Sequence, residues 1–286
     1  MKQVQWFPGH MAKARRLVEE KLPVIDIVFE LLDARAPIAS ANPMLKEIIK
    51  KKPRLIILNK ADLADPNRTR GWQEHFDKLG IKTIQTNALT DNLLPEMKAA
   101  VQVILAEKIA KEATKGMRPR PIRVMVVGIP NVGKSQFINR LCGTNKTRTG
   151  DKPGITTTQQ YVRIGDDFEI LDNPGILWPK FDDPLVGMRL ALLGSIKDDL
   201  LPLEEIVFFG LDFLARQYPK RLEERYDLTG VAQMTPEELI EAIGRRRGAL
   251  QSGDTVDTER VIKLFLHDFR NEKFGRISLE SIHKNV

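Results

Sequence analysis

The chain has 286 residues, enough for two average domains, one of which can bury a full-sized core. Hydrophobic residues make up 42% of it and charged residues 29%, which excludes global disorder. The formal net charge of +7 favours a polyanionic partner, although composition alone does not distinguish nucleic acid, a ribosome and anionic lipid.

Cysteine usage and apolar patterning narrow the expected location. The single cysteine, Cys142, excludes an intramolecular disulfide framework and fits a reducing compartment. No apolar run approaches the ~18 residues of a membrane span, and the first residues lack the apolar stretch of a signal peptide. We therefore expect a cytoplasmic protein with no membrane partner.

Short apolar runs alternate with amphipathic stretches through the first part of the chain. A basic helix is predicted over 11–21. The apolar runs predict strands over 25–32, 55–58, 83–85, 123–127, 162–164 and 169–171. The amphipathic stretches predict helices over 43–52, 68–79, 94–111 and 134–141. This alternation predicts an α/β fold with a mostly parallel sheet flanked by helices.

After residue 179 the pattern becomes helical. Helices are predicted over 185–196, 203–217, 235–247 and 257–272. Thr235 is a typical N-cap residue, followed by Pro236 at the first helical position and Glu238 three residues on. We place a domain boundary at 178–184 and expect a small all-α domain over 181–286.

A phosphate-binding loop is predicted between the strand at 123–127 and the helix after it. Residues 128–135 read Gly-Ile-Pro-Asn-Val-Gly-Lys-Ser, which fits G-x-x-x-x-G-K-[ST]. In such a loop backbone N–H groups encircle phosphate oxygens, Lys134 reaches the β- and γ-phosphates, and the Ser135 hydroxyl ligates Mg²⁺. The helix dipole also favours the anion. The nucleotide-binding residues expected here are Asn131, Val132, Gly133, Lys134, Ser135 and Gln136.

A base-recognition element with the sequence Asn-Lys-Ala-Asp directly follows the strand at 55–58. Its aspartate can accept hydrogen bonds from N1–H and the exocyclic amine of guanine, a donor pair that adenine lacks. After the next strand a backbone N–H can reach guanine O6, although an ordinary turn fits the same residues. The residues expected to bind the guanine nucleotide are Asn59, Lys60, Asp62, Asn87 and Ala88.

Two further segments have the composition of nucleotide-dependent switches. Asp172-Asn-Pro-Gly175 closes the strand at 169–171. Asp172 can hold Mg²⁺ through water, and the Gly175 N–H can contact the γ-phosphate and lose it after hydrolysis. The loop at 150–158 ends in three threonines, one of which can complete the metal shell. Thr156 is the first choice for this role in catalysis, but spacing leaves the other two open.

Together these elements resemble the five signature elements of translation-factor-class GTPases in a changed order. The base-recognition element precedes the phosphate loop by about seventy residues. That order, with Trp-Phe-Pro-Gly-His-Met at 6–11, Asp-Ala-Arg at 33–35 and Pro-Gly-Ile-Leu-Trp-Pro-Lys-Phe at 174–181, resembles the circularly permuted GTPases of the YlqF/RbgA family (ribosome biogenesis GTPase A).

The resemblance implies a GTP-binding domain over 1–180, with a basic segment at 1–21, and an RNA- or ribosome-binding domain over 181–286. It implies GTP and GDP as ligands, and a GTPase that binds the large ribosomal subunit and its rRNA late in assembly and leaves after hydrolysis. No DNA partner is expected. Because about ten residues separate Gly175 from the helical domain, we expect a shift of Gly175 to tilt that domain.

One departure from the usual GTPase pattern bears on hydrolysis. Ile176 follows Gly175, where many GTPases have a glutamine that orients the attacking water, so slow intrinsic hydrolysis is expected. His10, in a predicted loop before the basic helix, is a candidate replacement, and a helix-capping or RNA-contacting role is the alternative. Asn131 matches the position at which similar family members ligate K⁺ near the phosphates.

Basic residues cluster at 108–123, at 140–163 and at Arg245-Arg246-Arg247. Any one cluster can be a solvated face, but several on a chain of charge +7 favour contact with a phosphate backbone. The sequence therefore predicts a guanine-nucleotide switch enzyme that binds rRNA. An rRNA-binding scaffold with incidental GTP turnover is the alternative, and Asp62 disfavours an ATP-dependent kinase.

Overall fold

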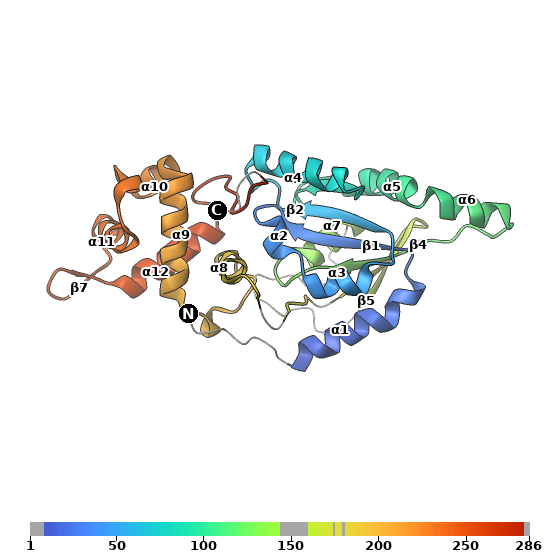
Figure 1. Ribbon diagram of the computed structural model, residues 1–286, viewed down its shortest axis with the longest axis horizontal. Coiled ribbons are helices and arrows are strands. Elements are labelled where there is room, and N and C mark those ends of the chain that lie inside the picture. Colours follow the sequence, from blue (N-terminus) through green and yellow to red (C-terminus); the bar gives the residue numbers. More distant parts are fainter. Residues whose placement is uncertain (1–8, 144–159, 174, 179–180, 283–286) are drawn as a thin grey trace. The chain divides into compact units, whose positions relative to one another are not determined.

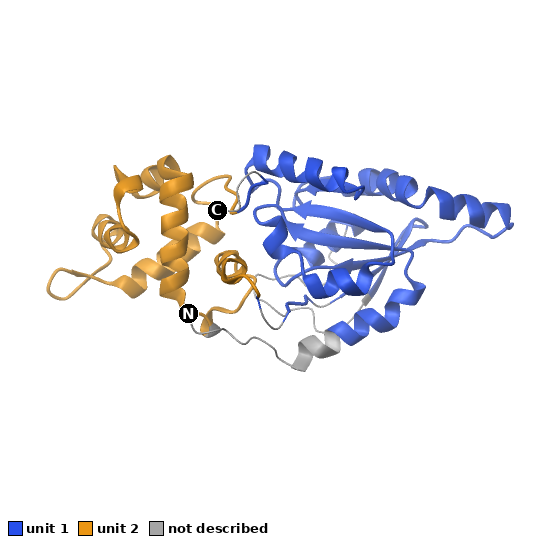
Figure 2. Ribbon diagram, in the orientation of Figure 1, with its two compact units in different colours: residues 1–181, 280–286 blue, residues 182–279 orange. Residues whose placement is uncertain are grey.

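The computed structural model describes residues 9–143, 160–173, 175–178 and 181–282. The chain divides into two compact units, residues 1–181 with 280–286 and residues 182–279 (Figure 2). The return of the last residues to the first unit differs from the predicted domain over 181–286. It has a local cause, because the Glu280 carboxylate accepts hydrogen bonds from the backbone N–H groups of Ile38 and Ala39.

A six-stranded sheet forms the centre of the first unit (Figure 1). Its spatial order is β3 (Thr83–Thr86), β2 (Arg54–Asn59), β1 (Ile27–Asp33), β4 (Ile122–Val127), β6 (Phe168–Asp172) and β5 (Gln160–Ile164). Neighbouring strands are parallel except β5, which runs antiparallel to β6. The predicted α/β fold with a mostly parallel sheet is therefore confirmed.

Helices cover both faces of this sheet (Figure 1). One face packs against α1 (Gly9–Lys21), α3 (Pro43–Ile49) and α4 (Pro66–Lys78). The other packs against α5 (Leu93–Ile104) and α7 (Lys134–Cys142), with Phe137 of α7 edge-on to Phe29 of β1. Every residue of β1 is buried, as expected for a central parallel strand covered on both sides.

Two predicted elements differ in detail. The helix predicted over 94–111 is two helices, α5 and α6 (Ala106–Thr114), because Leu105 turns inward and is buried whereas α6 has no buried residue to hold it in line. His10 belongs to the first turn of α1 and not to a preceding loop. Helix ends commonly extend a residue or two beyond the apolar pattern that predicts them.

Part of the basic cluster at 108–123 is neutralised inside the first unit. The Asp26 carboxylate, 4% exposed, accepts hydrogen bonds from Lys108, Arg120 and the backbone N–H of Arg123. Burial acts to raise the pKa of Asp26, but these donors together hold it well below its ordinary value. These cations therefore stabilise the fold, and the cluster has less charge for a partner than its sequence indicates.

The second unit is a bundle around α9 (Leu203–Gln217), which contacts α8 (Pro184–Leu192), α10 (Pro219–Tyr226), α11 (Pro236–Arg247) and α12 (Thr258–Arg270). Thr235 and Glu238 form the predicted capping box of α11. The expectation of an all-α domain needs one correction, a hairpin of β7 (Leu250–Gln251) and β8 (Thr255–Val256). Gly253 adopts the left-handed conformation in its turn.

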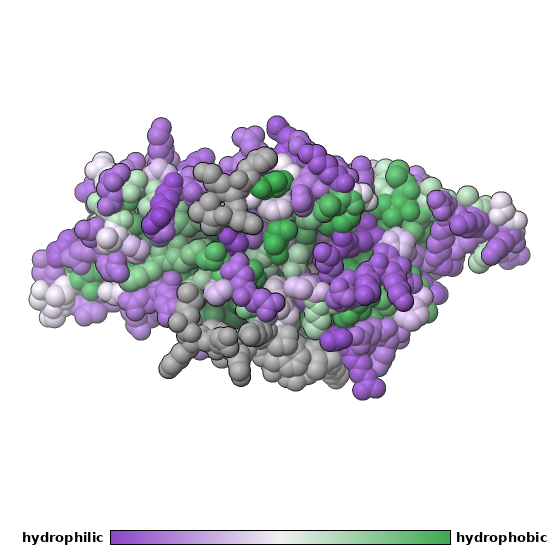
Figure 3. Space-filling view, viewed as in Figure 1, coloured by the Kyte–Doolittle hydropathy of each residue, from purple (hydrophilic) through white to green (hydrophobic). Residues whose placement is uncertain are grey.

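Hydrophilic residues cover most of the face drawn in Figure 3, and hydrophobic residues form separate patches there. Among the described residues, no helix combines the length and apolar character needed to cross a bilayer.

Candidate nucleotide-binding site

The predicted motifs meet at one edge of the sheet. Five strands run in the same direction, so their last residues lie along the same edge. Those residues, or the loops after them, belong to the predicted motifs and to the Asp-Ala-Arg segment at 33–35. In open α/β sheets this is the edge where ligands bind.

The phosphate loop has the backbone that its glycines permit. Gly128 and Gly133 have φ values of 154° and 97°, and a Cβ on Gly128 would lie 2.7 Å from the Leu31 carbonyl oxygen. Asn131 is left-handed at φ 57° despite its side chain. α7 begins at Lys134, so the N–H groups of its first turn, which have no partner within the helix, face the loop.

The base-recognition loop contacts the phosphate loop directly. Asn59 Nδ2 donates to the Val132 carbonyl oxygen at 2.8 Å, and Lys60 Nζ donates to the Asn131 carbonyl oxygen at 2.7 Å. A Cβ on Gly133 would lie 2.3 Å from Asn59 Nδ2, so only glycine fits there. Two segments about seventy residues apart in the sequence thus form one site.

A buried ion pair that sequence analysis assigned no role supports this contact. Arg35 makes a bidentate pair with Asp33 at 2.9 and 2.7 Å, and Lys60 Nζ lies 3.5 Å from the same carboxylate. Burial acts to raise the pKa of Asp33, yet the charges of Arg35 and Lys60 lower it to about 2. The predicted nucleotide contact Lys60 therefore has two protein partners, which fix the direction of its side chain.

The end of β3 completes the base side of the site. Ala61 donates its N–H to the Thr86 carbonyl oxygen at 3.0 Å, and Thr86 Oγ1 donates to Asn59 Oδ1 at 3.1 Å. Asp62 lies half-buried in the turn that follows. Asn87 forms a turn of its own, in which its N–H donates to Asp91 Oδ2 at 2.6 Å and its side chain accepts from Leu89 N.

The phosphate loop and the switch segment bring two oppositely charged side chains, Lys134 and Asp172, together in the protein interior. Lys134 is 6% exposed and Asp172 is 1% exposed. Burial lowers the pKa of Lys134 to about 8, and the charge of Asp172 opposes this shift. Burial raises the pKa of Asp172 to about 6, against the charge of Lys134 and a hydrogen bond from Ser135. Charging either group therefore costs the fold stability.

The oxygen atoms of this place fit a hard cation. Asp172 Oδ1 is buried and has no hydrogen-bond partner in the described part of the structure, and the hydroxyl of Ser135 adjoins the same carboxylate. Mg²⁺ prefers such oxygen ligands and keeps several waters. No group of three or more His, Cys, Asp and Glu side chains among the described residues is placed to hold a metal without further ligands.

The switch segment packs against the phosphate loop. A Cβ on Gly175 would lie 2.6 Å from Pro130 N and 3.0 Å from Lys134 Nζ. Ile176 is 1% exposed in the core beside α1 and α3, and its carbonyl oxygen accepts from Asn42 Nδ2 at 2.8 Å. The side chain of Ile176 therefore lies in the core and is not available to orient water. Asn173 is buried and donates to the carbonyl oxygens of Val126 and Leu171, so its side chain has a structural role.

The structure does not describe the side chains of two predicted site residues. Thr156 lies outside the described residues with the other threonines of its loop, and the side chain of His10 lies outside them too.

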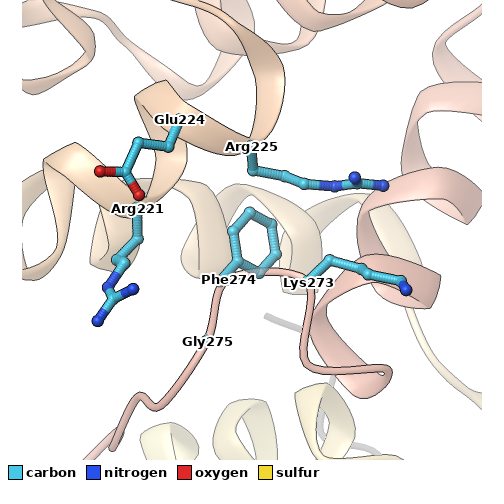
Figure 4. Close-up of a pocket in the computed structure, with 6 residues that line it drawn as sticks. All are labelled: Arg221, Glu224, Arg225, Lys273, Phe274 and Gly275. Carbon is cyan, nitrogen blue, oxygen red and sulfur yellow. The ribbon is translucent and has the colours of Figure 1, made fainter.

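A separate pocket of about 260 Å³ lies within the helical unit (Figure 4). The ring of Phe274 is at its centre, with Arg221 directed one way and Arg225 and Lys273 the other. Arg225 makes a bidentate pair with the buried Asp268, whereas Arg221 and Lys273 are exposed.

Known proteins resemble the chain over nearly its full length. The model of a family described as 50S ribosome-binding GTPase matches residues 123–233. Ribosome biogenesis GTPase A of Bacillus pumilus is 50% identical over 97% of this chain and 98% of its own length. The chain belongs to the ribosome biogenesis GTPase A family. A member of this family is a GTPase, so the chain binds guanine nucleotide and hydrolyses GTP.

Solved structures agree with this membership of the ribosome biogenesis GTPase A family. A GDP-bound structure of YlqF aligns with a TM-score of 0.70 at 28% identity, covering 94% of this chain and all of that one. GNP-bound YlqF from T. maritima aligns with a TM-score of 0.65 over 94% of this chain and 98% of that one. The family match at 123–233 leaves the base-recognition loop upstream, in keeping with the permuted order of motifs.

The raised pKa of Asp172 predicts that Asp172→Asn stabilises the nucleotide-free protein above pH 6. The folded wild type keeps this carboxyl neutral below a pKa of about 6, and its stabilising effect is lost as pH rises from about 4 through 6. The gain in free energy of unfolding should therefore grow over that interval and level off at about 3 kcal/mol. Urea denaturation from pH 4 to pH 8 measures it.

Asp26→Asn is the matched comparison, because the pKa of Asp26 is lowered and not raised. It should destabilise the protein at neutral pH, and the loss should shrink as the wild-type carboxyl becomes protonated in acid. An Asp172→Asn protein less stable than wild type at pH 8 would contradict the assignment of Asp172 as a buried charge that costs stability.

Proposed function

We propose that the protein is a nucleotide-dependent switch in late assembly of the large ribosomal subunit. It binds the subunit and its rRNA in the cytoplasm with GTP bound and leaves after hydrolysis, with no DNA or membrane partner. The observation that supports this most directly is the contact of Asn59 and Lys60 with the phosphate loop, which makes the two halves of a GTP site one structure. Family membership supports the ribosomal partner.

Each loop of the site has a proposed role. Asp62 recognises the guanine edge, with Asn59, Lys60, Asn87 and Ala88 shaping the base pocket. Lys134 and the N–H groups of residues 131–136 hold the phosphates and stabilise the charge that develops during water attack. Gly175 contacts the γ-phosphate through its N–H.

The proposal also assigns the metal ligands. Ser135 binds Mg²⁺ directly, Asp172 binds it through water, and Thr156 completes its shell. When bound, Mg²⁺ neutralises charge on the β- and γ-phosphate oxygens. Asn131 is the proposed K⁺ ligand. Its carbonyl oxygen accepts a hydrogen bond from Lys60.

Base recognition by Asp62 predicts a change of specificity in Asp62→Asn. The amide presents a donor where the carboxylate accepted from the guanine amine, so GDP affinity should fall at least 100-fold and xanthosine diphosphate should bind better than GDP. Titration calorimetry with both nucleotides measures this. Asp65→Asn, which changes a helix cap three residues away, is the control. Unchanged preference for guanine in Asp62→Asn would contradict the proposed base site.

The burial of Ile176 supports a water-positioning group from elsewhere, for which we propose His10. His10→Ala should abolish the stimulation of GTP hydrolysis by large ribosomal subunits and leave GDP affinity unchanged, because the imidazole acts on water and not on the nucleotide. Single-turnover hydrolysis with and without subunits measures this, with His75→Ala as the control. Retained stimulation would exclude His10. Subunits that bind the wild type and never accelerate turnover would favour the scaffold alternative.

We propose that exposed cations of the helical unit bind rRNA. The three arginines at 245–247, which form a basic cluster in the sequence, already have partners within the protein. Arg245 pairs with Glu241 and Asp254, Arg246 contacts Asp227, and Arg247 donates to the Arg225 carbonyl oxygen. Arg221 and Lys273 are the exposed cations of the pocket in Figure 4. We infer that their charges contact RNA phosphates.

Replacing both Arg221 and Lys273 with Ala should reduce the slope of log affinity against log salt by about 2, because each cation releases about one counterion on binding phosphate. Filter binding of the full chain to 23S rRNA at several salt concentrations measures the slope. The control replaces Arg216 and Lys263, exposed cations paired with Asp212 and Glu259 on their own helices. Equal slopes for the two double variants would contradict an RNA contact at the pocket.

A further inference from the structure

We propose that Glu280 is a positioning residue for the guanine-nucleotide site. It lies where the chain returns from the helical unit to the first unit, about 240 residues from the helix that it contacts. The inference rests on the proposed nucleotide site at the carboxyl edge of the sheet. It adds to that site a connection from the far end of the chain.

Glu280 provides the N-terminal cap that α2 (Pro37–Ser40) lacks in its own sequence. Ala36 stands at the N-cap and has no side chain to accept a hydrogen bond. Instead Glu280 Oε2 accepts from Ile38 N at 2.7 Å and Oε1 accepts from Ala39 N at 2.9 Å. Glu280 is 6% exposed, so the two charge-assisted hydrogen bonds that hold this short helix are shielded from solvent. Without Glu280, the buried Ala39 N–H loses its acceptor.

The other end of α2 holds the strand that precedes it. Ser40 Oγ accepts from the backbone N–H of Asp33 at 3.0 Å and donates to the Ala36 carbonyl oxygen at 2.7 Å. Ser40 is 1% exposed and Asp33 is 2% exposed. A displacement of α2 therefore moves the end of β1, the strand between the two nucleotide loops.

From Asp33 the contacts continue to the phosphate loop. The Asp33 carboxylate lies 3.5 Å from Lys60 Nζ, and Lys60 Nζ donates to the Asn131 carbonyl oxygen at 2.7 Å. Asn131 has a left-handed backbone, a conformation that asparagine adopts more readily than most residues with a side chain. The steps from Glu280 to the loop are thus contacts between neighbouring residues, and most of the participating side chains are buried.

The position of Glu280 gives this connection a functional meaning. Residue 279 is the last of the helical unit. Glu280 is therefore hydrogen-bonded to α2 through its side chain and covalently joined to the helical unit through its backbone. If nucleotide binds more tightly when α2 is capped, bound nucleotide also favours the state in which Glu280 is hydrogen-bonded to α2. By reciprocity, an RNA whose binding breaks the hydrogen bonds of Glu280 to α2 lowers nucleotide affinity by the same factor by which nucleotide lowers RNA affinity.

A double-mutant cycle in the full chain tests the connection. Glu280→Ala should weaken GDP binding roughly tenfold, because α2 loses both cap bonds, and Glu280→Gln, whose amide oxygen still accepts one of them, should weaken it less. In a Lys60→Met background, where the last step is already broken, Glu280→Ala should weaken GDP binding less than about twofold. Fluorescence titration with a labelled GDP measures the four proteins of the cycle and Glu280→Gln, and Glu259→Ala is the control.

Several outcomes would overturn the proposal. If Glu280→Ala weakens GDP binding by the same factor in both backgrounds, Glu280 acts only through general stability. If wild type and Glu280→Ala bind GDP equally, there is no connection. Should Glu280→Ala fail to fold, Ser40→Ala breaks the next step and must show the same dependence on Lys60. A wild-type protein that binds no GDP would contradict the proposed nucleotide site itself and is thereby distinguished from these results.

Discussion

The nucleotide site depends on one constraint, the close approach of the base loop to the phosphate loop. Asn59 Nδ2 occupies the space that a Cβ on Gly133 would need, and the Asn59 amide bonds the loop that Gly133 permits. The loops follow β2 and β4, which flank β1, so they leave the same edge of the sheet with one strand between them and meet across the end of that strand. This geometry depends on which strands are neighbours in the sheet and not on the order of the motifs in the chain.

The sequence predicts those parts of the site that rest on local patterns. The strands, the phosphate loop and the helix at Leu203–Gln217 follow from apolar periodicity and glycine spacing. The role of Arg35, the cap from Glu280 and the return of the chain end were not predicted. They depend on contacts between residues whose separation in the sequence follows no motif, and α2 is too short to show a periodic apolar pattern. The base loop was predicted from a motif, but its contact with the phosphate loop required the sheet order.

The buried charged groups of the first unit are of two kinds, those whose charge stabilises the fold and those whose charge destabilises it. Asp26 and Asp33 are buried with enough donors and cations to keep their pKa values low, so their charges stabilise the fold. Asp172 and Lys134 have shifts of the opposite sense, and Asp172 Oδ1 has no hydrogen-bond partner among the described residues. Lys134 Nζ donates to the Gly128 and Ile129 carbonyl oxygens, so in the described part of the chain the carboxylate of Asp172 is the member of this pair that keeps an unused acceptor.

The packing after Gly175 limits how a nucleotide signal can leave the site. Sequence order alone predicts that a shift of Gly175 tilts the helical unit, yet Ile176, Leu177 and Trp178 are all buried, and Trp178 packs edge-on against Phe181 at 5.0 Å. Close-packed side chains do not slide gradually, so Gly175 can move this segment only by changing it between two packed arrangements. Transmission by this route therefore requires a switch of the whole packed segment and not a graded shift of Gly175 alone.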